Sequence, residues 1–178
     1  MGVTAEQARE DPREGNRALA ELYNTHKNIE QTQAGLTWEH SINPDNKLRL
    51  MGYVGRRNMV QYLSIPAAPQ ANPTHSGGVV GFQRDYMGAD VRWISHSQLA
   101  SRPFDLVAGL AWDNLREDRR GWENFVGPVS APSYGHQGRL RRDERNKVYN
   151  IDPYLQASWK LAERWQVDAG LRRSSVRF

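Results

Sequence analysis

The stretch NIDPYLQASWKLAERWQVDAGLR, residues 150–172, decides the fold class, because apolar side chains recur at every second position in both of its arms. In the first arm the apolar face carries Ile151, Leu155 and Trp159, and the second arm repeats the pattern. A period of two is typical of strands and not of helices. The break at 162–164 is short and mostly polar, so the two arms are predicted to form an antiparallel hairpin.

The same alternation recurs in four earlier segments. It predicts an all-β protein, an antiparallel up-and-down meander of about six long strands spanning residues 28–178. The turn sequence Asn43-Pro44-Asp45-Asn46 separates the first two strands. The apolar faces of the four segments hold Ala34, Leu36 and Trp38, then Leu48, Leu50 and Val54, then Met87, Val91 and Trp93, and finally Phe104, Leu106, Leu110 and Trp112.

Residues 1–27 differ from the rest and are expected to form a loop with a short helical segment. Thr4 is a candidate N-cap, and Gln7 would complete a capping box. Asp11, which precedes a proline, should end this first helix. A second short helical run is expected around Leu19. Neither run has a broad apolar stripe, so this segment is predicted to be an appendage of the β wall.

The composition narrows the class of protein. Only 38% of the 178 residues are hydrophobic, yet the chain has 6 Trp and 7 Tyr. This mixture suits strands with one apolar and one polar face. The chain has no cysteine, which excludes disulfides and thiolate metal sites. The net charge of +4 is spread along the chain without a basic stripe among stacking aromatics, so no nucleic-acid partner is expected.

The connections between the predicted strands alternate between short and long. The long ones are expected near 58–83 and 114–147, where breakers and charges interrupt the alternation. In a meander this order places the short turns at one end of the sheet and the long loops at the other. Transmembrane β-barrels have short periplasmic turns and long external loops. The pattern therefore favours a partial transmembrane β-barrel whose apolar face contacts outer-membrane lipid.

The positions of the large aromatic residues agree with a membrane wall. Trp112 follows Phe104 by eight residues on the same face, which is about 26 Å along a strand and roughly 20 Å of height at a tilt of ~40°. That height is close to the ~25 Å apolar band of such barrels. The alternative is a soluble β-sandwich that binds carbohydrate or protein, with these aromatics in its core. The predicted membrane girdle comprises Trp38, Trp93, Phe104, Trp112, Trp159 and Trp165.

Several segments in a fixed order resemble a known family. Residues 29–58, reading IEQTQAGLTWEHSINPDNKLRLMGYVGRRN, are followed by QANP at 70–73, by Gly77 and Gly78, and by RDY at 84–86. This series resembles the barrel of TonB-dependent outer-membrane receptors. The resemblance implies a 22-stranded barrel that is plugged by an N-terminal globular domain and imports scarce ligands, such as ferric siderophores, with energy delivered by TonB.

The chain departs from that whole in ways that predict a fragment. Residues 1–20 are too polar for a signal peptide, and no apolar run is long enough for a membrane helix. No plug or TonB-contacting segment is recognisable, and six strands are fewer than the usual minimum of eight in a closed barrel. We therefore expect an internal piece of a barrel wall in the cell outer membrane. TonB would be a partner only of the full-length receptor, and the piece alone should not transport.

The predicted ligand-binding residues lie in the second long loop, where arginines and aromatics occur together. Arginine forks bind carboxylates and phosphates, and aromatic rings supply rigid contact area. The alternative is a solvated loop whose arginines pair with Glu117, Asp118, Glu123, Asp143 and Glu144. The candidate site residues are Arg116, Arg119, Arg120, Trp122, Tyr134, His136 and Arg139.

The sequence predicts no enzyme. Asp113, Glu117 and Asp118 could imitate a glycosidase pair, but carboxylates so close at a strand end more often begin a loop. The five histidines lack metal-ligand spacing, so neither a metal site nor a cofactor is expected.

Overall fold

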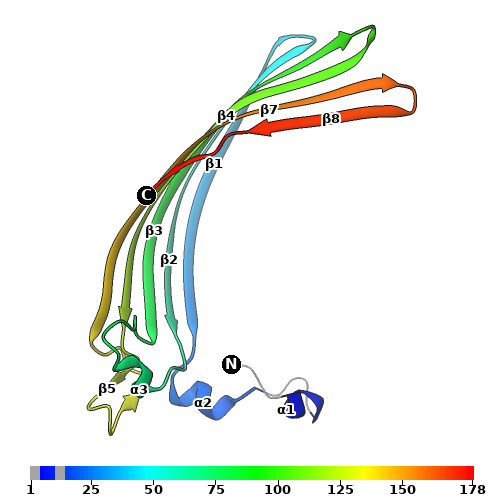
Figure 1. Ribbon diagram of the computed structural model, residues 1–178. Coiled ribbons are helices and arrows are strands. Elements are labelled where there is room, and N and C mark those ends of the chain that lie inside the picture. Colours follow the sequence, from blue (N-terminus) through cyan, green and yellow to red (C-terminus); the bar gives the residue numbers. More distant parts are fainter. Residues whose placement is uncertain (1–4, 11–14) are drawn as a thin grey trace. The chain divides into compact units, whose positions relative to one another are not determined.

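A computed structural model describes residues 5–10 and 15–178 of the chain. Its strands follow one another as a meander, in the pairing order β1-β2-β3-β4-β7-β8 (Figure 1). The predicted fold class, an antiparallel meander with six long strands, is confirmed. These strands are β1 (Lys27–Asn43), β2 (Asn46–Tyr62), β3 (Val79–Leu99), β4 (Arg102–Trp122), β7 (Leu140–Ala162) and β8 (Trp165–Arg172).

Three shorter strands complete the β structure. The strand β9 (Ser175–Arg177) pairs with β7, while β5 (Phe125–Val126) and β6 (Ser133–Tyr134) form a separate two-stranded sheet. Among the described residues β1 and β8 are not paired with each other, so the large sheet has two edges and does not close.

The helices are short. The predicted helical N-terminal segment is confirmed by α1 (Ala5–Glu10) and α2 (Arg17–Leu22), while the proposed cap at Thr4 and the break at Asp11 lie outside the described residues. The side chain of Asn16 caps α2 by accepting the N–H of Leu19 at 3.2 Å. A further helix, α3 (Ala67–Gln70), was not predicted. No helix in the described part of the chain has the length and apolar character to cross a membrane.

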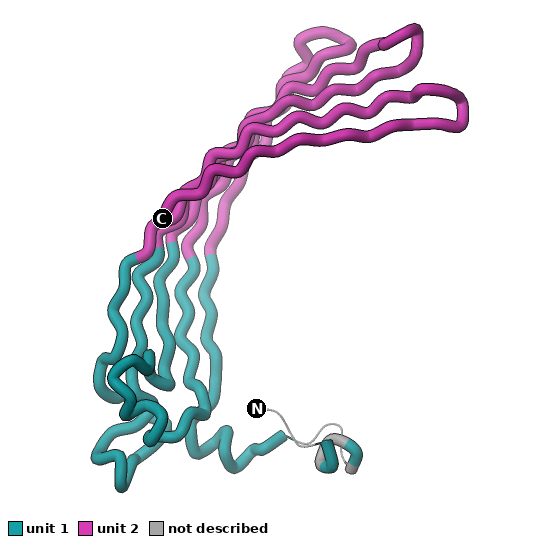
Figure 2. Tube along the Cα trace, viewed as in Figure 1, with its two compact units in different colours: residues 1–31, 57–84, 117–145 teal, residues 32–56, 85–116, 146–178 magenta. Residues whose placement is uncertain are grey.

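The chain divides into two compact units, and the long strands other than β8 have residues in both (Figure 2). Unit 1 comprises residues 1–31, 57–84 and 117–145, and unit 2 comprises residues 32–56, 85–116 and 146–178. We describe each unit by itself.

The apolar side of unit 2 is its exposed side. On β3 the side chains of Met87, Val91 and Trp93 are 43%, 44% and 40% exposed, whereas Asp90 on the opposite face is only 5% exposed. A β-sandwich would bury the apolar side beneath a second sheet. In the described residues of unit 2 no second sheet covers it. We call this side of the strands the apolar face and the opposite side the polar face.

The polar face of unit 2 is closed by tyrosine rings that lie over glycines of neighbouring strands. A Cβ added to Gly109 would come within 2.2 Å of the Tyr154 ring, and one added to Gly88 within 2.6 Å of the Tyr53 ring. Glycine is required at these two positions because the ring occupies the place of a side chain. Such aromatic coverage also fixes the strand register.

Carboxylates anchor these rings. The hydroxyl of Tyr154 donates to Asp90 Oδ2 at 2.8 Å, and the hydroxyl of Tyr53 donates to Asp113. Arg92 Nε donates to the other oxygen of Asp90 at 2.7 Å. The polar face of unit 2 therefore has a hydrogen-bonded network where a soluble protein has an apolar core.

The long loops are shorter than predicted. Strand structure extends through residues 58–62 and 79–83, and through 114–122 and 140–147, so the irregular segments shrink to 63–78 and 123–139. At 114–122 and 140–147 both faces of the strands carry mostly polar residues, whereas 79–82 and 59–60 are apolar without strict alternation. The alternation of hydropathy therefore disappears although the backbone ladder continues.

The short connection predicted between the third and fourth long strands is a two-residue turn at Ala100 and Ser101, whose φ angles are 52° and 58°. Positive φ at both central residues matches the twist of the flanking strands. Neither residue is the Gly or Asn that usually marks such a turn, so the sequence pattern did not reveal its exact position.

A pair of fully buried amides joins the two irregular segments of unit 1. Gln70 Nε2 donates to Asn124 Oδ1 at 2.7 Å, and the backbone N–H of Asn124 donates to Gln70 Oε1 at 3.2 Å. Asn124 Nδ2 also donates to the carbonyls of Leu63 and Ile65, at 2.6 and 3.1 Å. These bonds hold residues 63–78 against residues 123–139.

Replacing Asn124 with Ala should loosen the segment 63–78. The change leaves the Gln70 amide and the Leu63 carbonyl buried without partners, which costs about 1–3 kcal/mol. We expect faster hydrogen exchange across 63–78, measured by mass spectrometry, and a smaller increase in the exchange rate elsewhere. Asn146→Ala, at an exposed position with no recorded side-chain bond, is the control. Equal exchange in both variants would show that the amide pair does not hold the loop.

Candidate functional site

Four arginines lie on the polar face of unit 1, one from each of four strands that neighbour one another in the sheet. Each continues the polar-face alternation of its own strand, so the four side chains lie on one face of the sheet in unit 1. We call them the polar-face arginines. They are Arg57 on β2, Arg84 on β3, Arg119 on β4 and Arg142 on β7.

Two glutamates partner this set. Glu117, only 5% exposed, accepts from Arg84 Nε at 2.9 Å and also from its Nη2. Glu144 Oε1 lies 2.6 Å from Arg142 Nε. Four guanidinium groups thus share two carboxylates, and the polar face of unit 1 carries an excess of positive charge at this level.

Three of the four arginines retain donors that nothing satisfies. The Nε atoms of Arg57, Arg119 and Arg142 are buried and have no hydrogen-bond partner in the described part of the chain. The short distance from Arg142 to Glu144 is an ion pair in which the N–H does not point at the oxygen. Buried donors of this kind are normally paired, so three orphaned ones on one face of unit 1 call for an explanation, such as a bound water or ion.

The ionisation of this cluster is set by its own contacts. The close contact with Arg142 lowers the pKa of Glu144, and the charge of Arg119 adds to the effect. The same contact raises the pKa of Arg142. Both groups are therefore charged at neutral pH. An approaching anion meets fixed charges and displaces no proton.

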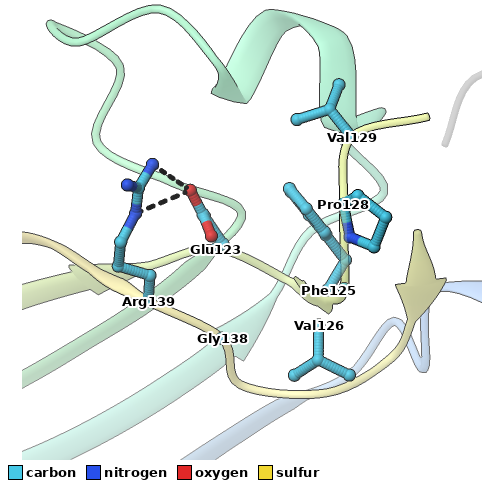
Figure 3. A pocket seen from close by; sticks show the side chains of 8 residues that line it. Glu123, Phe125, Val126, Pro128, Val129, Gly138 and Arg139 are labelled. Atoms are coloured by element: carbon cyan, nitrogen blue, oxygen red, sulfur yellow. Dashed lines mark hydrogen bonds and ion pairs between the residues drawn. The ribbon is translucent and has the colours of Figure 1, made fainter. Parts of the chain in front are cut away.

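A second feature of unit 1 is a pocket of about 440 Å³ in the segment 123–139 (Figure 3). Arg139 borders it, and its Nη2 lies 2.9 Å from Glu123 Oε1. The carboxylate of Glu123 is also held by Arg141, whose side chain is 8% exposed. Arg139 is 68% exposed and can leave without stranding a buried charge. The apolar lining comes from Phe125, Val126, Pro128 and Val129.

The predicted site residues do not form one site. Arg116, Arg119, Arg120 and Trp122 lie in the strand β4, so their placement in an external loop was wrong. Because neighbours on a strand point to opposite faces, Arg119 lies on the polar face and Arg120 on the other. Arg120 and Trp122 share a separate groove of about 310 Å³.

The other three predicted residues belong to the segment 123–139. Tyr134 is structural: its hydroxyl accepts the N–H of Ala67 at 3.0 Å, and its ring lies 4.5 Å from that of Tyr23. His136 is exposed, and Arg139 borders the pocket. Burial, followed by the contact with Tyr134, raises the pKa of Tyr23, which keeps the Tyr23 hydroxyl neutral.

The alternative of paired loop charges is largely confirmed. Each acid named for it has an arginine partner: Glu117 with Arg84, Asp118 with Arg145, Glu123 with Arg139 and Arg141, Asp143 with Arg120, and Glu144 with Arg142. Arg116 has no recorded ion pair within the described residues. Exposed pairs of this kind contribute little to stability.

The histidines are dispersed. His26 stacks on Tyr62 at 4.6 Å, and His96 Nδ1 lies 2.7 Å from Asp105. Across residues 5–10 and 15–178, His, Asp and Glu side chains nowhere gather in a group of three that could hold a metal ion.

Sequence reasoning missed two parts of the site. The polar-face arginines were not recognised as a cluster, because their four strands are brought together only by register. An alternation of arginine with other residues, continued past the apolar zone, is the signal that could have revealed them. The buried amides of Gln70 and Asn124 have no sequence signal, since both lie in segments without periodicity.

A comparison with protein-family models agrees with this architecture. A model described as the TonB dependent receptor-like β-barrel matches residues 3–178, which is nearly the whole chain. The family consists of outer-membrane receptors for ligand uptake, which depend on TonB, and it is not a family of enzymes. The exposed apolar face, the polar network on the opposite face and this match lead to one conclusion: the chain belongs to the TonB-dependent receptor β-barrel family.

Proposed function

We propose that this chain forms part of the wall of a receptor for an anionic iron chelate, such as a ferric siderophore, and that the polar-face arginines bind that chelate. The observation that carries the proposal is the orphaned Nε of Arg57, Arg119 and Arg142. Guanidinium groups match carboxylate and other planar oxyanions with two parallel hydrogen bonds. Their fixed charges need no rearrangement to receive such a ligand.

The segments 63–78 and 123–139 are the proposed external loops. Arg139 is their proposed ligand-binding arginine, because it is exposed and can exchange Glu123 for a ligand carboxylate. His136 is proposed as a further polar contact. Tyr134 is proposed to act indirectly, by fixing α3 through the N–H of Ala67. TonB would supply energy in the full-length receptor.

The girdle aromatics are proposed to mark the borders of the lipid. Trp38, Trp93 and Trp165 are 48%, 40% and 72% exposed, which is unusual for such large rings in a soluble protein. The indole N–H of Trp93 donates to Asn46 at 3.0 Å, and that of Trp159 to the Leu99 carbonyl at 3.1 Å. Rings with one bonded polar atom and a large apolar body suit the membrane interface.

The facing of β4 can be tested with one pair of substitutions. Leu106→Arg puts a charge on the apolar face, and Val107→Arg puts the same charge on the polar face. Near mid-membrane the first should destabilise the receptor by ~2–4 kcal/mol. Urea titration of the receptor folded in phosphatidylcholine bilayers measures the difference. A larger loss from Val107→Arg would reverse the assigned faces.

The ligand proposal can be tested with the double substitution Arg57→Ala and Arg119→Ala in the receptor. Losing these charged donors should weaken chelate binding roughly 10- to 100-fold, because one hydrogen bond to a charged group contributes about 1.5–3 kcal/mol. Tryptophan quenching by carboxylate, hydroxamate and catecholate ferric siderophores measures the affinity. Arg120→Ala, on the other face of the same strand, is the control. Unchanged affinity for every chelate in the double variant would rule out these arginines.

A further inference from the structure

The apolar face of unit 2 ends in a row of charged side chains that belongs to neither the polar-face arginines nor the loop pocket. On β4 the last large apolar residue of this face is Trp112. The next residues on the same face are Asn114 and then Arg116. Arg116 borders a groove of about 700 Å³ with Val54 and Met87, which are apolar-face residues of the two preceding strands. A cation therefore adjoins the apolar surface directly.

The register of the sheet aligns four charged residues across four strands. Asn150 on β7 donates to Asp113 on β4 at 3.0 Å, and counting outward from this pair brings Lys147 opposite Arg116. The contact of His96 with Asp105 fixes β3 against β4 in the same way, which brings Asp85 opposite Arg116.

The next member of the row is fixed by a direct contact. Arg56 on β2 is paired with Asp85 at 2.6 Å. We call this row the outward belt. It consists of Arg56, Asp85, Arg116 and Lys147.

The outward belt has more positive than negative charge. Asp85 is the single acid in the row, and it is already paired with Arg56. Arg116 and Lys147 lie side by side, and neither has an ion pair recorded within the described residues. A third cation, Arg177 on β9, stands beside them over the Tyr149 ring at 6.0 Å from its centroid. Side-by-side cations repel each other, so their proximity favours an anion that both can bind.

The height of the outward belt above Trp112 indicates which anion it can bind. Arg116 follows Trp112 by four residues, which is about 13 Å along the strand and roughly 10 Å of height at a tilt of ~40°. Tryptophan settles at the border of the hydrocarbon, and the headgroup layer beyond it is roughly 5–8 Å thick. The cations are thus placed at or just beyond lipid phosphates. Tyr149, one position nearer the apolar zone on β7, suits the interface between them.

We propose that the outward belt binds the phosphorylated headgroup of a membrane lipid, with Arg116 and Lys147 sharing one phosphate and Arg177 beside them. The acyl chains of the same lipid would lie along the apolar face, against Val54 and Met87. A free phosphate would gain nothing from this apolar neighbourhood. The lipid therefore explains both halves of the groove.

The proposal is tested by titrating diphosphorylated lipid A into the receptor in phosphatidylcholine nanodiscs and counting bound lipid by native mass spectrometry. Arg116→Ala with Lys147→Ala should weaken binding roughly 10- to 30-fold, as expected for two basic side chains at a charged lipid surface. Dephosphorylated lipid A should bind the wild type no better than it binds the variant. Arg102→Ala with Arg164→Ala removes the same charge at the short turns and should leave binding unchanged.

Two results would overturn the proposal. Equal lipid A binding by the Arg116/Lys147 variant and the wild type would exclude the belt as the site, as would an equal loss in the control variant. Inorganic pyrophosphate that competes with lipid A at equal affinity would mean a free-anion site in place of a lipid site. Heat-modifiable migration of each variant on gels checks its folding. If the alanine pair does not fold, Arg116→Gln with Lys147→Gln replaces it.

Discussion

The structure depends on one constraint, the alternation of side chains along paired strands. Because successive residues point to opposite faces, each strand must present two surfaces of different chemistry. In unit 2 the surfaces are inverted relative to a soluble protein: Asp90 and Asp152 are 5% and 2% exposed, whereas Val54 and Val91 on inner strands are 54% and 44% exposed. Only a surrounding medium as apolar as those valines makes this arrangement stable. The outer membrane of the family is such a medium.

The inverted arrangement places a demand on the polar face, where buried carboxylates need partners. Tyrosine hydroxyls and arginines meet that demand for Asp90 and Asp113, and the rings that bear the hydroxyls cover glycines that would otherwise leave gaps. Unit 1 uses the same alternation, but it buries apolar residues such as Met59, Val79 and Phe125. There the faces differ in pairing: Arg120 on one face is matched by Asp143, whereas Arg119 on the other keeps an orphaned Nε. The surplus of donors in unit 1 is therefore confined to one face.

The sequence predicts the strands well only where one of their faces is apolar. Where one face is apolar, the period of two is visible in hydropathy, and strands such as the one carrying Leu106 and Trp112 are predictable. Where both faces are polar, as around Arg116 and Arg142, the hydropathy pattern does not predict a strand. The backbone hydrogen bonds between strands nevertheless continue there. The exact position of the turn at Ala100 was not predicted for a related reason, since its positive φ is imposed by strand twist and not by a turn-forming residue. The alternation of hydropathy reveals only the part of a strand that has one apolar face. The backbone pairing of the same strand extends beyond that part.

The candidate sites were less predictable because their residues become neighbours only through the register in which the strands pair. Arg57, Arg84, Arg119 and Arg142 are far apart in sequence, and no spacing rule connects them. A shift of any strand by one residue would move its arginine to the opposite face. The tyrosine–glycine contacts at Gly88 and Gly109 oppose such a shift, because a displaced ring would meet a Cβ. Strand register, more than any local motif, therefore decides on which face each arginine of a strand lies.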